Sequence, residues 1–358
     1  MRVLKKITGE FWWDVARTCD YATFYHTPIW QELAKRLFPG RYRDETFGAI
    51  LPSGVRVIFP IVSKRRIGPL RWLESAPIGG YGGFIANGPV SPAEATQIYK
   101  QACAWSAASL YIVDNPLGSP LPDRVKPQFS LVVNETAYLV PLDADFDTVF
   151  ARFSPALRKH YRNGIKNGAH IRLATSLDDY RAFYPNYRDA IDRWGRDENY
   201  GYTWYQIEQV YHLSQIYPEN IKLWLIMLNE QIVGGRIVLY WNRHVIAWNG
   251  TAHRDSFKYN VMPVAHTETI RDAIQRDSRY LDLGTSGHKD SLIQFKQRFS
   301  PVAMPLGGWL YENPIISSTR MVYHKGRNTL AALRRREVVP KLVGQSEEAP
   351  PSAIEDDA

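Results

Sequence analysis

The stretch from Tyr280 to Phe299, YLDLGTSGHKDSLIQFKQRF, places a lysine close to a small polar loop that contains glycine. Glycine lets main-chain atoms approach a ligand closely, so the loop is a candidate substrate-binding segment. Its candidate contact residues are Gly284, Thr285 and Ser286. Lys296 follows on the next predicted element, where a fixed positive charge can stabilise the oxyanion that forms during acyl transfer.

Lys296 and its neighbour Phe295 are the candidate catalytic residues, Lys296 as the stabilising charge and Phe295 as a wall of the acyl pocket. An attacking amine must also lose a proton, and Asp282 and His288 are candidate bases for this step. For Asp282, capping of the following loop is the favoured interpretation. For the whole stretch, the alternative is an ordinary strand–loop–helix unit with a solvated lysine, because charged residues are mostly exposed.

The elements that position these residues are a strand over 280–283 and a helix, because Leu292, Phe295 and Phe299 recur at helical spacing. Signals elsewhere predict a mixed α/β chain. A helix over 154–168 has Ser154 as its cap and proline at its first position. Another helix starts with a Thr-Pro pair at 27–28, and a strand is predicted over 55–63.

The segment 280–299 resembles the C-terminal signature of the FemAB family, in which Asp-Leu-Gly ends a strand and Phe-Lys precedes an aromatic residue. Other family-like motifs follow one another in the same order along the chain. They are FYHTPIW, PIGGYGG, an arginine-rich helix and IVGG. The resemblance covers about Phe24 to Tyr311. FemAB proteins transfer amino acids from aminoacyl-tRNA onto peptidoglycan precursors.

The resemblance implies an α/β fold of two GNAT-like domains in tandem, each a mixed sheet flanked by helices. The implied domains are 1–145 and 146–313, with the active site in the second. A C-terminal helix over 314–343 is expected to return to the first domain. The residues 344–358 form an acidic tail that we expect to be disordered.

The resemblance also implies substrate contacts outside the 280–299 stretch. Lys35 matches a basic residue that helps to bind phosphate, and Tyr81 lies in the glycine-rich loop, for which a tight turn is the alternative interpretation. Contacts to a diphosphate or to substrate are implied for Arg196, Tyr200 and Tyr259, with Arg193 as the next candidate.

The arginine-rich helix carries a stripe of basic residues, which includes Arg158 and Arg162. They can hold tRNA or a diphosphate, and a solvated helix face is the alternative.

The donor is expected to be aminoacyl-tRNA or acyl-CoA, and no bound cofactor is expected. GNAT enzymes that use acyl-CoA bind its pyrophosphate at a glycine-containing loop with free N–H groups. The corresponding segment, RDSFKYNVMP over 254–263, has no glycine, and Pro263 removes one donor. This argues against conventional CoA binding. The two cysteines, Cys19 and Cys103, and the spacing of the histidines predict no metal site.

Charge and composition favour an anionic partner. The chain has 358 residues and a formal net charge of +8, and its last fourteen residues hold five acidic and no basic side chains. A basic body attracts RNA, anionic lipid headgroups or diphosphate-linked substrates. The N-terminal residues lack the apolar core of a signal peptide, and no run is long enough to span a membrane. We therefore expect a cytoplasmic protein that can associate peripherally with the inner face of the membrane.

Three hypotheses for the function follow. The first is transfer of an aminoacyl or acyl group from aminoacyl-tRNA to an amine of a cell-wall or cell-surface glycan precursor, such as a peptidoglycan precursor. The second is an acyl-CoA-dependent N- or O-acyltransferase of polysaccharide biosynthesis. The third is a GNAT scaffold without catalysis that binds polyanions, in which replacing Lys296 leaves function intact.

Overall fold

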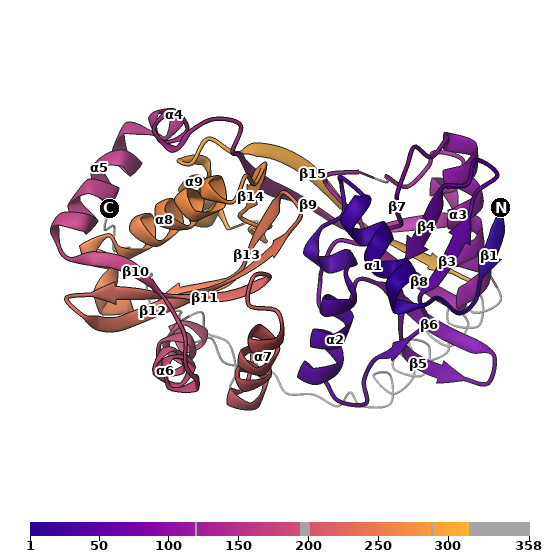
Figure 1. Ribbon diagram of the computed structural model, residues 1–358, viewed down its shortest axis with the longest axis horizontal. Coiled ribbons are helices and arrows are strands. Elements are labelled where there is room, and N and C mark those ends of the chain that lie inside the picture. Colours follow the sequence, from indigo (N-terminus) through magenta and orange to yellow (C-terminus); the bar gives the residue numbers. More distant parts are fainter. Residues whose placement is uncertain (119, 194–200, 288, 315–358) are drawn as a thin grey trace, which may run out of the picture. The chain divides into compact units, whose positions relative to one another are not determined.

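The computed structural model describes residues 1–118, 120–193, 201–287 and 289–314 (Figure 1). Residues 1–312 form one compact unit, and residues 313–358 form a second unit, of which only Asn313 and Pro314 are described. Apart from Pro314, the predicted helix over 314–343 and the tail over 344–358 therefore lie outside the described residues. No helix in the described part of the chain is long and apolar enough to cross a membrane.

Eleven strands of the described residues form one sheet, in the order β10-β11-β12-β13-β14-β9-β15-β8-β6-β5-β2. Its strands are β2 (Arg43–Asp44), β5 (Val62–Ile67), β6 (Leu70–Ser75), β8 (Ala107–Val113), β9 (Phe129–Pro141), β10 (Ala169–Leu173), β11 (Ile221–Leu228), β12 (Gln231–Trp241), β13 (His244–Ala252), β14 (Tyr280–Asp282) and β15 (Val302–Glu312). A smaller sheet has the order β1-β3-β4-β7. It consists of β1 (Arg2–Leu4), β3 (Phe47–Ile50), β4 (Arg56–Phe59) and β7 (Ile85–Ala86).

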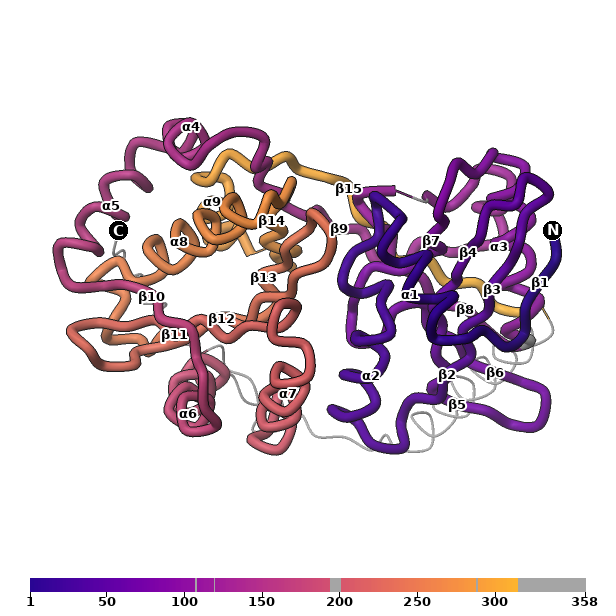
Figure 2. The backbone as a smooth tube through the Cα atoms, viewed as in Figure 1, coloured from indigo at the N-terminus to yellow at the C-terminus, as the bar shows by residue number. Residues whose placement is uncertain are grey.

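The long strands β9 and β15 join an N-terminal half (residues 1–128) to a C-terminal half (residues 142–301), as the path of the chain shows (Figure 2). The two strands are antiparallel neighbours from the pair Val302 and Leu139 to the pair Tyr311 and Phe129. β9 also pairs with β14 of the C-terminal half, and β15 with β8 of the N-terminal half. The domain boundary predicted at residue 145 follows β9 and stays a prediction.

Helices cover both faces of the C-terminal half of the sheet (Figure 1). α8 (Val261–Gln275) packs on β10, β11 and β13, with α5 (Pro155–Lys166) beside it, and α6 (Leu177–Arg193) and α7 (Trp204–Ile216) cover the other face. The remaining helices are α1 (Gly9–Thr18), α2 (Pro28–Leu37), α3 (Pro92–Ser106), α4 (Phe146–Arg152) and α9 (Asp290–Gln297), with 3₁₀ turns at Phe24–His26, Lys126–Gln128 and Arg254–Tyr259. The mixed α/β fold predicted from the sequence is therefore confirmed.

Local sequence signals account for two helix starts. The Ser154 hydroxyl accepts a hydrogen bond from the backbone N–H of Leu157 at 3.2 Å, and Pro155 occupies the first turn of α5. Thr27 caps α2 in the same way, through the N–H of Trp30 at 3.3 Å. Such a cap satisfies one of the N–H groups that a helix start leaves without a partner.

The predicted strand over 55–63 is wrong in one respect. The chain forms two strands there, and β4 belongs to the small sheet whereas β5 belongs to the large one. The break falls at Pro60 and Ile61. Proline has no N–H to donate to a strand ladder, so the chain can leave one sheet and enter another at this point.

Packing between the halves is dense and largely apolar. The Trp241 indole N–H donates to the carbonyl of Ala16 at 3.0 Å, and the rings of Trp30 and Trp248 meet edge to face, with centroids 5.6 Å apart. The Gln206 side chain donates to the carbonyl of Leu37 at 2.9 Å. The N-terminal helices lie against β12, β13 and α7 in this way, and one cluster of buried apolar residues includes members of both halves.

Close packing of α5 on α8 leads to a prediction about Gly164. A Cβ atom at this position would lie 2.5 Å from Val264 Cγ2 and 2.9 Å from the carbonyl oxygen of Asn260. We expect Gly164→Ala to lower the free energy of unfolding by about 1–3 kcal/mol, because overpacking forces the helices apart. Urea denaturation measures this change. Gly9→Ala is the matched control, since nothing lies within 4 Å of a Cβ atom there, and equal stability of the two variants would contradict the packing argument.

Candidate active site

Lys296 is buried, with 5% of its surface exposed, on the last turn of α9. Its Nζ donates hydrogen bonds to the carbonyl oxygens of Gly284 at 3.0 Å and Thr285 at 2.7 Å. Burial is the main reason why the pKa of Lys296 is lowered to about 8, while the negative charge of Asp282 acts in the opposite direction. The fold thus brings the predicted lysine and the predicted loop into direct contact.

Phe295 lies next to Lys296 and packs against aromatic rings of the core. Its ring meets the imidazole of His266 edge to face, with centroids 5.0 Å apart, and the ring of Phe299 at 5.4 Å. His266 belongs to α8, so Phe295 fixes the position of α9 against α8.

A cavity of about 710 Å³ opens beside Lys296 and Phe295. Thr285 and Leu283 line it from the loop, and other walls come from β12, β13, α8 and α9. Apolar lining residues include Trp248, Phe257, Met262 and Leu292, and the basic ones are Arg193, Arg236, Lys296 and Arg298, with His160 and His266. No acidic side chain lines this cavity in the described part of the chain.

Arg236 and His266 form a buried pair that the sequence interpretation did not single out. The Nη2 atom of Arg236 lies 2.6 Å from His266 Nε2 and 2.8 Å from Nδ1. His266 Nδ1 also lies 2.9 Å from the carbonyl oxygen of Met262, which can only accept, so Nδ1 carries the proton. Burial lowers the pKa of His266 well below its ordinary value, and it keeps the ring neutral.

Arg236 itself is 3% exposed, and burial lowers its pKa to about 9. It sits opposite Gly250 in the pairing of β12 with β13, where a Cβ atom would lie 3.2 Å from Arg236 Nε. The missing side chain at Gly250 therefore gives the guanidinium its space. A charged residue in the otherwise apolar strand QIVGGRIVLYW was the signal that could have revealed it.

Asp282 holds the loop in place, as its favoured interpretation predicts. Its Oδ1 accepts the backbone N–H of Gly284 at 2.7 Å, and its Oδ2 accepts the hydroxyl of Tyr81 at 2.6 Å. His244 Nε2 lies 3.5 Å from the same Oδ2. Gly284 has φ +68°, a left-handed conformation that glycine adopts without strain.

Tyr81 is buried and reaches the C-terminal half from the N-terminal half. Burial raises the pKa of Tyr81 well above its ordinary value, so its hydroxyl stays protonated and donates to Asp282. Tyr81 does not line the cavity beside Lys296. Its contact with Asp282 makes it a support of the loop, and its role in substrate binding stays a prediction.

The other predicted contacts are not gathered around this cavity. Ser286 lines a separate cavity of about 220 Å³ against β9, and its buried hydroxyl has no partner among the described residues. Lys35 is exposed on α2, and Tyr259 is 38% exposed. On α5, Arg158 donates to the carbonyl of Ala151 at 3.0 Å, and Arg162 lies over the ring of Phe150 at 5.9 Å.

The positions of three candidate residues are not described by the structure. Arg196, Tyr200 and His288 lie outside the described residues. Arg193, the next candidate after Arg196, does line the cavity, and it forms an ion pair with Asp189 at 3.1 Å. Among the described residues, no group of three or more His, Cys, Asp or Glu side chains could hold a metal ion.

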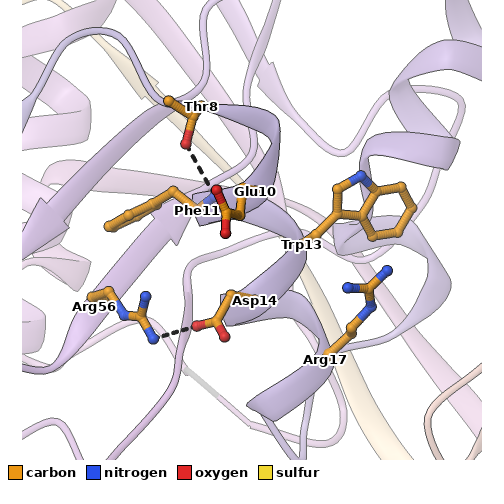
Figure 3. Close-up of a pocket in the computed structure, with 7 residues that line it drawn as sticks. All are labelled: Thr8, Glu10, Phe11, Trp13, Asp14, Arg17 and Arg56. Carbon is orange, nitrogen blue, oxygen red and sulfur yellow. Dashed lines mark hydrogen bonds and ion pairs between the residues drawn. The ribbon is translucent and has the colours of Figure 1, made fainter.

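A second large cavity, of about 650 Å³, lies on α1 in the N-terminal half (Figure 3). Asp14 and Arg56 form an ion pair at its wall, and Arg17 lies over the ring of Trp13 at 5.2 Å. Thr8 caps α1 through the N–H of Phe11 at 3.2 Å. The cavity contains no predicted site residue.

Comparison with known proteins identifies the class to which this fold belongs. Residues 152–297 match the family described as Acetyltransferase (GNAT) domain, and this range includes Phe295 and Lys296. No curated protein sequence that was compared is significantly similar to the chain.

Solved structures share the fold over most of the chain. FemX has a TM-score of 0.70 and 11% identity, over 90% of this chain and 99% of the FemX chain. The C-terminal domain of a protein assigned as a lysylphosphatidylglycerol synthetase, from Agrobacterium fabrum, has a TM-score of 0.55 and 12% identity, over 87% of this chain and 94% of that domain. A protein of unknown function from Bacteroides thetaiotaomicron has a TM-score of 0.55 and 13% identity, with coverages of 87% and 100%.

At identities this low, the likeness establishes a shared fold. The FemAB resemblance drawn from the sequence motifs is confirmed at that level, and so is the GNAT-like fold.

Proposed function

We propose that the protein is a FemAB-like transferase that moves an aminoacyl or acyl group onto an amine of a cell-wall or cell-surface glycan precursor. The observation that carries this proposal is the buried ammonium of Lys296 at the wall of a cavity of about 710 Å³. The names of two structural neighbours, FemX and a lysylphosphatidylglycerol synthetase, support a cell-envelope acceptor.

The proposed reaction begins when the acceptor nitrogen attacks the carbonyl carbon of the donor ester. A C–N bond forms, and the carbonyl oxygen becomes an oxyanion. The ester C–O bond then breaks, the amine loses a proton, and the leaving oxygen takes one up. Lys296 stabilises the oxyanion because an ammonium group in a buried site interacts strongly with developing negative charge.

The contacts of Lys296 suit this role. An ammonium group has three N–H donors, and the carbonyls of Gly284 and Thr285 take two of them. The third is left for the oxyanion. The two fixed bonds also orient Nζ, so little reorganisation is needed when charge develops. Phe295 would form the wall against which the acyl group rests.

For the donor, the start of α8 favours aminoacyl-tRNA over acyl-CoA. Pro263 lies in the first turn of α8 and cannot donate, and Val261 is fully buried. Gly164 of α5 packs against the carbonyls of Tyr259 and Asn260 at this helix start. A pyrophosphate bound there would need accessible N–H groups. We therefore propose aminoacyl-tRNA as the donor and no resident cofactor.

Donor binding tests this proposal. The purified protein is titrated with acetyl-CoA and with charged and uncharged tRNA at two salt concentrations. The proposal expects tRNA to bind more tightly when it is charged and more weakly at high salt, because phosphate contacts release counterions. Saturable binding of acetyl-CoA without a preference for tRNA would contradict the proposal. It would favour the alternative hypothesis, an acyl-CoA-dependent N- or O-acyltransferase.

The lowered pKa of Lys296 predicts how its contribution depends on pH. The stabilising form is the protonated one, and with a pKa of about 8 it is lost as the pH rises through this value. The measured quantity is the ratio of the transfer rate of the wild type to that of Lys296→Met, which cancels the ionisation of the acceptor amine. We expect this ratio to be about tenfold lower at pH 9 than at pH 7, because one pH unit above the pKa leaves roughly a tenth of the group charged. A ratio that stays constant over this range would contradict the assigned role.

A further inference from the structure

Arg236 carries a buried charge that no part of the described protein balances. Its Nε and Nη1 atoms are buried and have no hydrogen-bond partner among the described residues. Its Nη2 contacts only the neutral His266, and no carboxylate of the described residues forms an ion pair with it. A buried, unpaired guanidinium is costly, so proteins that keep one commonly use it for a ligand.

The surroundings of Arg236 reinforce this excess of positive charge. Lys296, Arg193 and Arg298 also line this cavity. None of its described lining residues is acidic. Of these charges, Arg193 forms an ion pair with Asp189, which also pairs with Arg254, and Lys296 has the buried Asp282 nearby. Arg236 is thus the member of the set whose charge is both deeply buried and uncompensated.

The neighbours of Arg236 give its side chain space and a hydrogen-bond acceptor. It lies on β12, and its register partner on β13 is Gly250, which leaves room for the guanidinium. His266 accepts a hydrogen bond from Nη2, which fixes the plane of the group. A neutral ligand can supply hydrogen-bond acceptors but leaves the charge of Arg236 unbalanced, and a cationic ligand would be repelled. An oxyanion supplies both the acceptors and the charge.

We propose that the cavity beside Lys296 binds an oxyanion, either a carboxylate or a phosphate group of one of the two transfer substrates, with Arg236 as its counter-charge. This rests on the proposed function in that the anion belongs to a group that reacts at Lys296. It adds a specificity: a transferred group with a cationic side chain is disfavoured at this site, and one with an anionic end is favoured.

The test measures anion binding by calorimetry, without any transfer reaction. Pyrophosphate represents the phosphate source and succinate the carboxylate source, each at constant ionic strength set with sodium chloride. Arg236→Met removes the charge and keeps a side chain of similar length. Arg181→Met is the matched control, because Arg181 is on α6, pairs with Asp178 and lies outside the cavity.

We expect one of the two anions to bind the wild type and Arg181→Met equally, and Arg236→Met at least tenfold more weakly. Which anion binds identifies the source. No binding of either anion, or equal binding by the two variants, overturns the proposal. Should Arg236→Met fail to fold, NMR of the wild type provides the test. The ring C–H signals of His266, which contacts Arg236, must shift when pyrophosphate or succinate saturates the protein. Signals that do not move overturn the proposal.

This experiment separates the inference from the proposed function. Anion binding without transfer from any donor would support the site and contradict the transferase. Transfer that depends on Lys296, in a protein that binds neither anion, would support the transferase and contradict the site.

Discussion

Replacing Lys296 by Met is expected to lower the transfer rate constant by about 10²–10³-fold, the usual effect of removing one donor that stabilises an oxyanion. Methionine keeps the length of the side chain and removes its charge and its hydrogen bonds. The expected loss is in kcat more than in KM, because the interaction forms in the transition state. Single-turnover transfer from charged tRNA measures it directly.

Lys289→Met is the matched control for this prediction. Lys289 precedes the same helix, is exposed, and does not line the cavity beside Lys296. We expect its transfer rate to equal that of the wild type. If Lys296→Met also kept the full rate while remaining folded by circular dichroism, the scaffold without catalysis would become the better hypothesis.

The second large effect is expected at Asp282, and it is on stability. Asp282 is fully buried, accepts from Tyr81 and Gly284, and lies near the charge of Lys296. Asp282→Ala would leave the Tyr81 hydroxyl and the Gly284 N–H without their acceptor. We expect it to lower the free energy of unfolding by about 3–5 kcal/mol, because each unsatisfied buried donor costs about 1–3 kcal/mol and the charge of Lys296 loses a nearby carboxylate. Urea denaturation followed by tryptophan fluorescence measures it.

Asp282→Asn separates the shape of this residue from its charge. The amide oxygen can still accept the N–H of Gly284, so we expect a loss of only about 1 kcal/mol, the value of one hydrogen bond. Without the negative charge, the pKa of Lys296 should fall further, because Asp282 raises it. The variant should therefore be folded but slower at pH 8. Full activity at pH 8 together with wild-type stability would show that Asp282 supports neither the loop nor Lys296.

Several parts of this protein follow from sequence alone because they depend on residues close together in the chain. The caps at Thr27 and Ser154 satisfy N–H groups within the same turn. The strand, loop and helix around Lys296 follow from an apolar run, a glycine and helical spacing. The contact of Lys296 with Gly284 spans only twelve positions. These are short-range features, and propensity and spacing carry the necessary information.

The sheet to which each strand belongs could not be predicted from local sequence in the same way. The segment over 55–63 has the composition of one strand, yet β4 and β5 pair with different partners. Which sheet a strand joins depends on surfaces offered by distant segments, so a residue pattern of period two does not decide it.

The electrostatic environment of the site was decided by tertiary structure. Tyr81 and Asp282 are 201 positions apart, and Arg236 and His266 are 30 apart on different elements. Their burial, and with it the lowered pKa values of Lys296 and Arg236, exists only once distant segments of the chain have packed around them. Residue types and spacing alone predict a lysine beside a glycine-containing loop in a GNAT-like chain. They do not show that this lysine is buried, or that its cavity holds a second, unbalanced positive charge, because desolvation depends on the whole packed surroundings of a group.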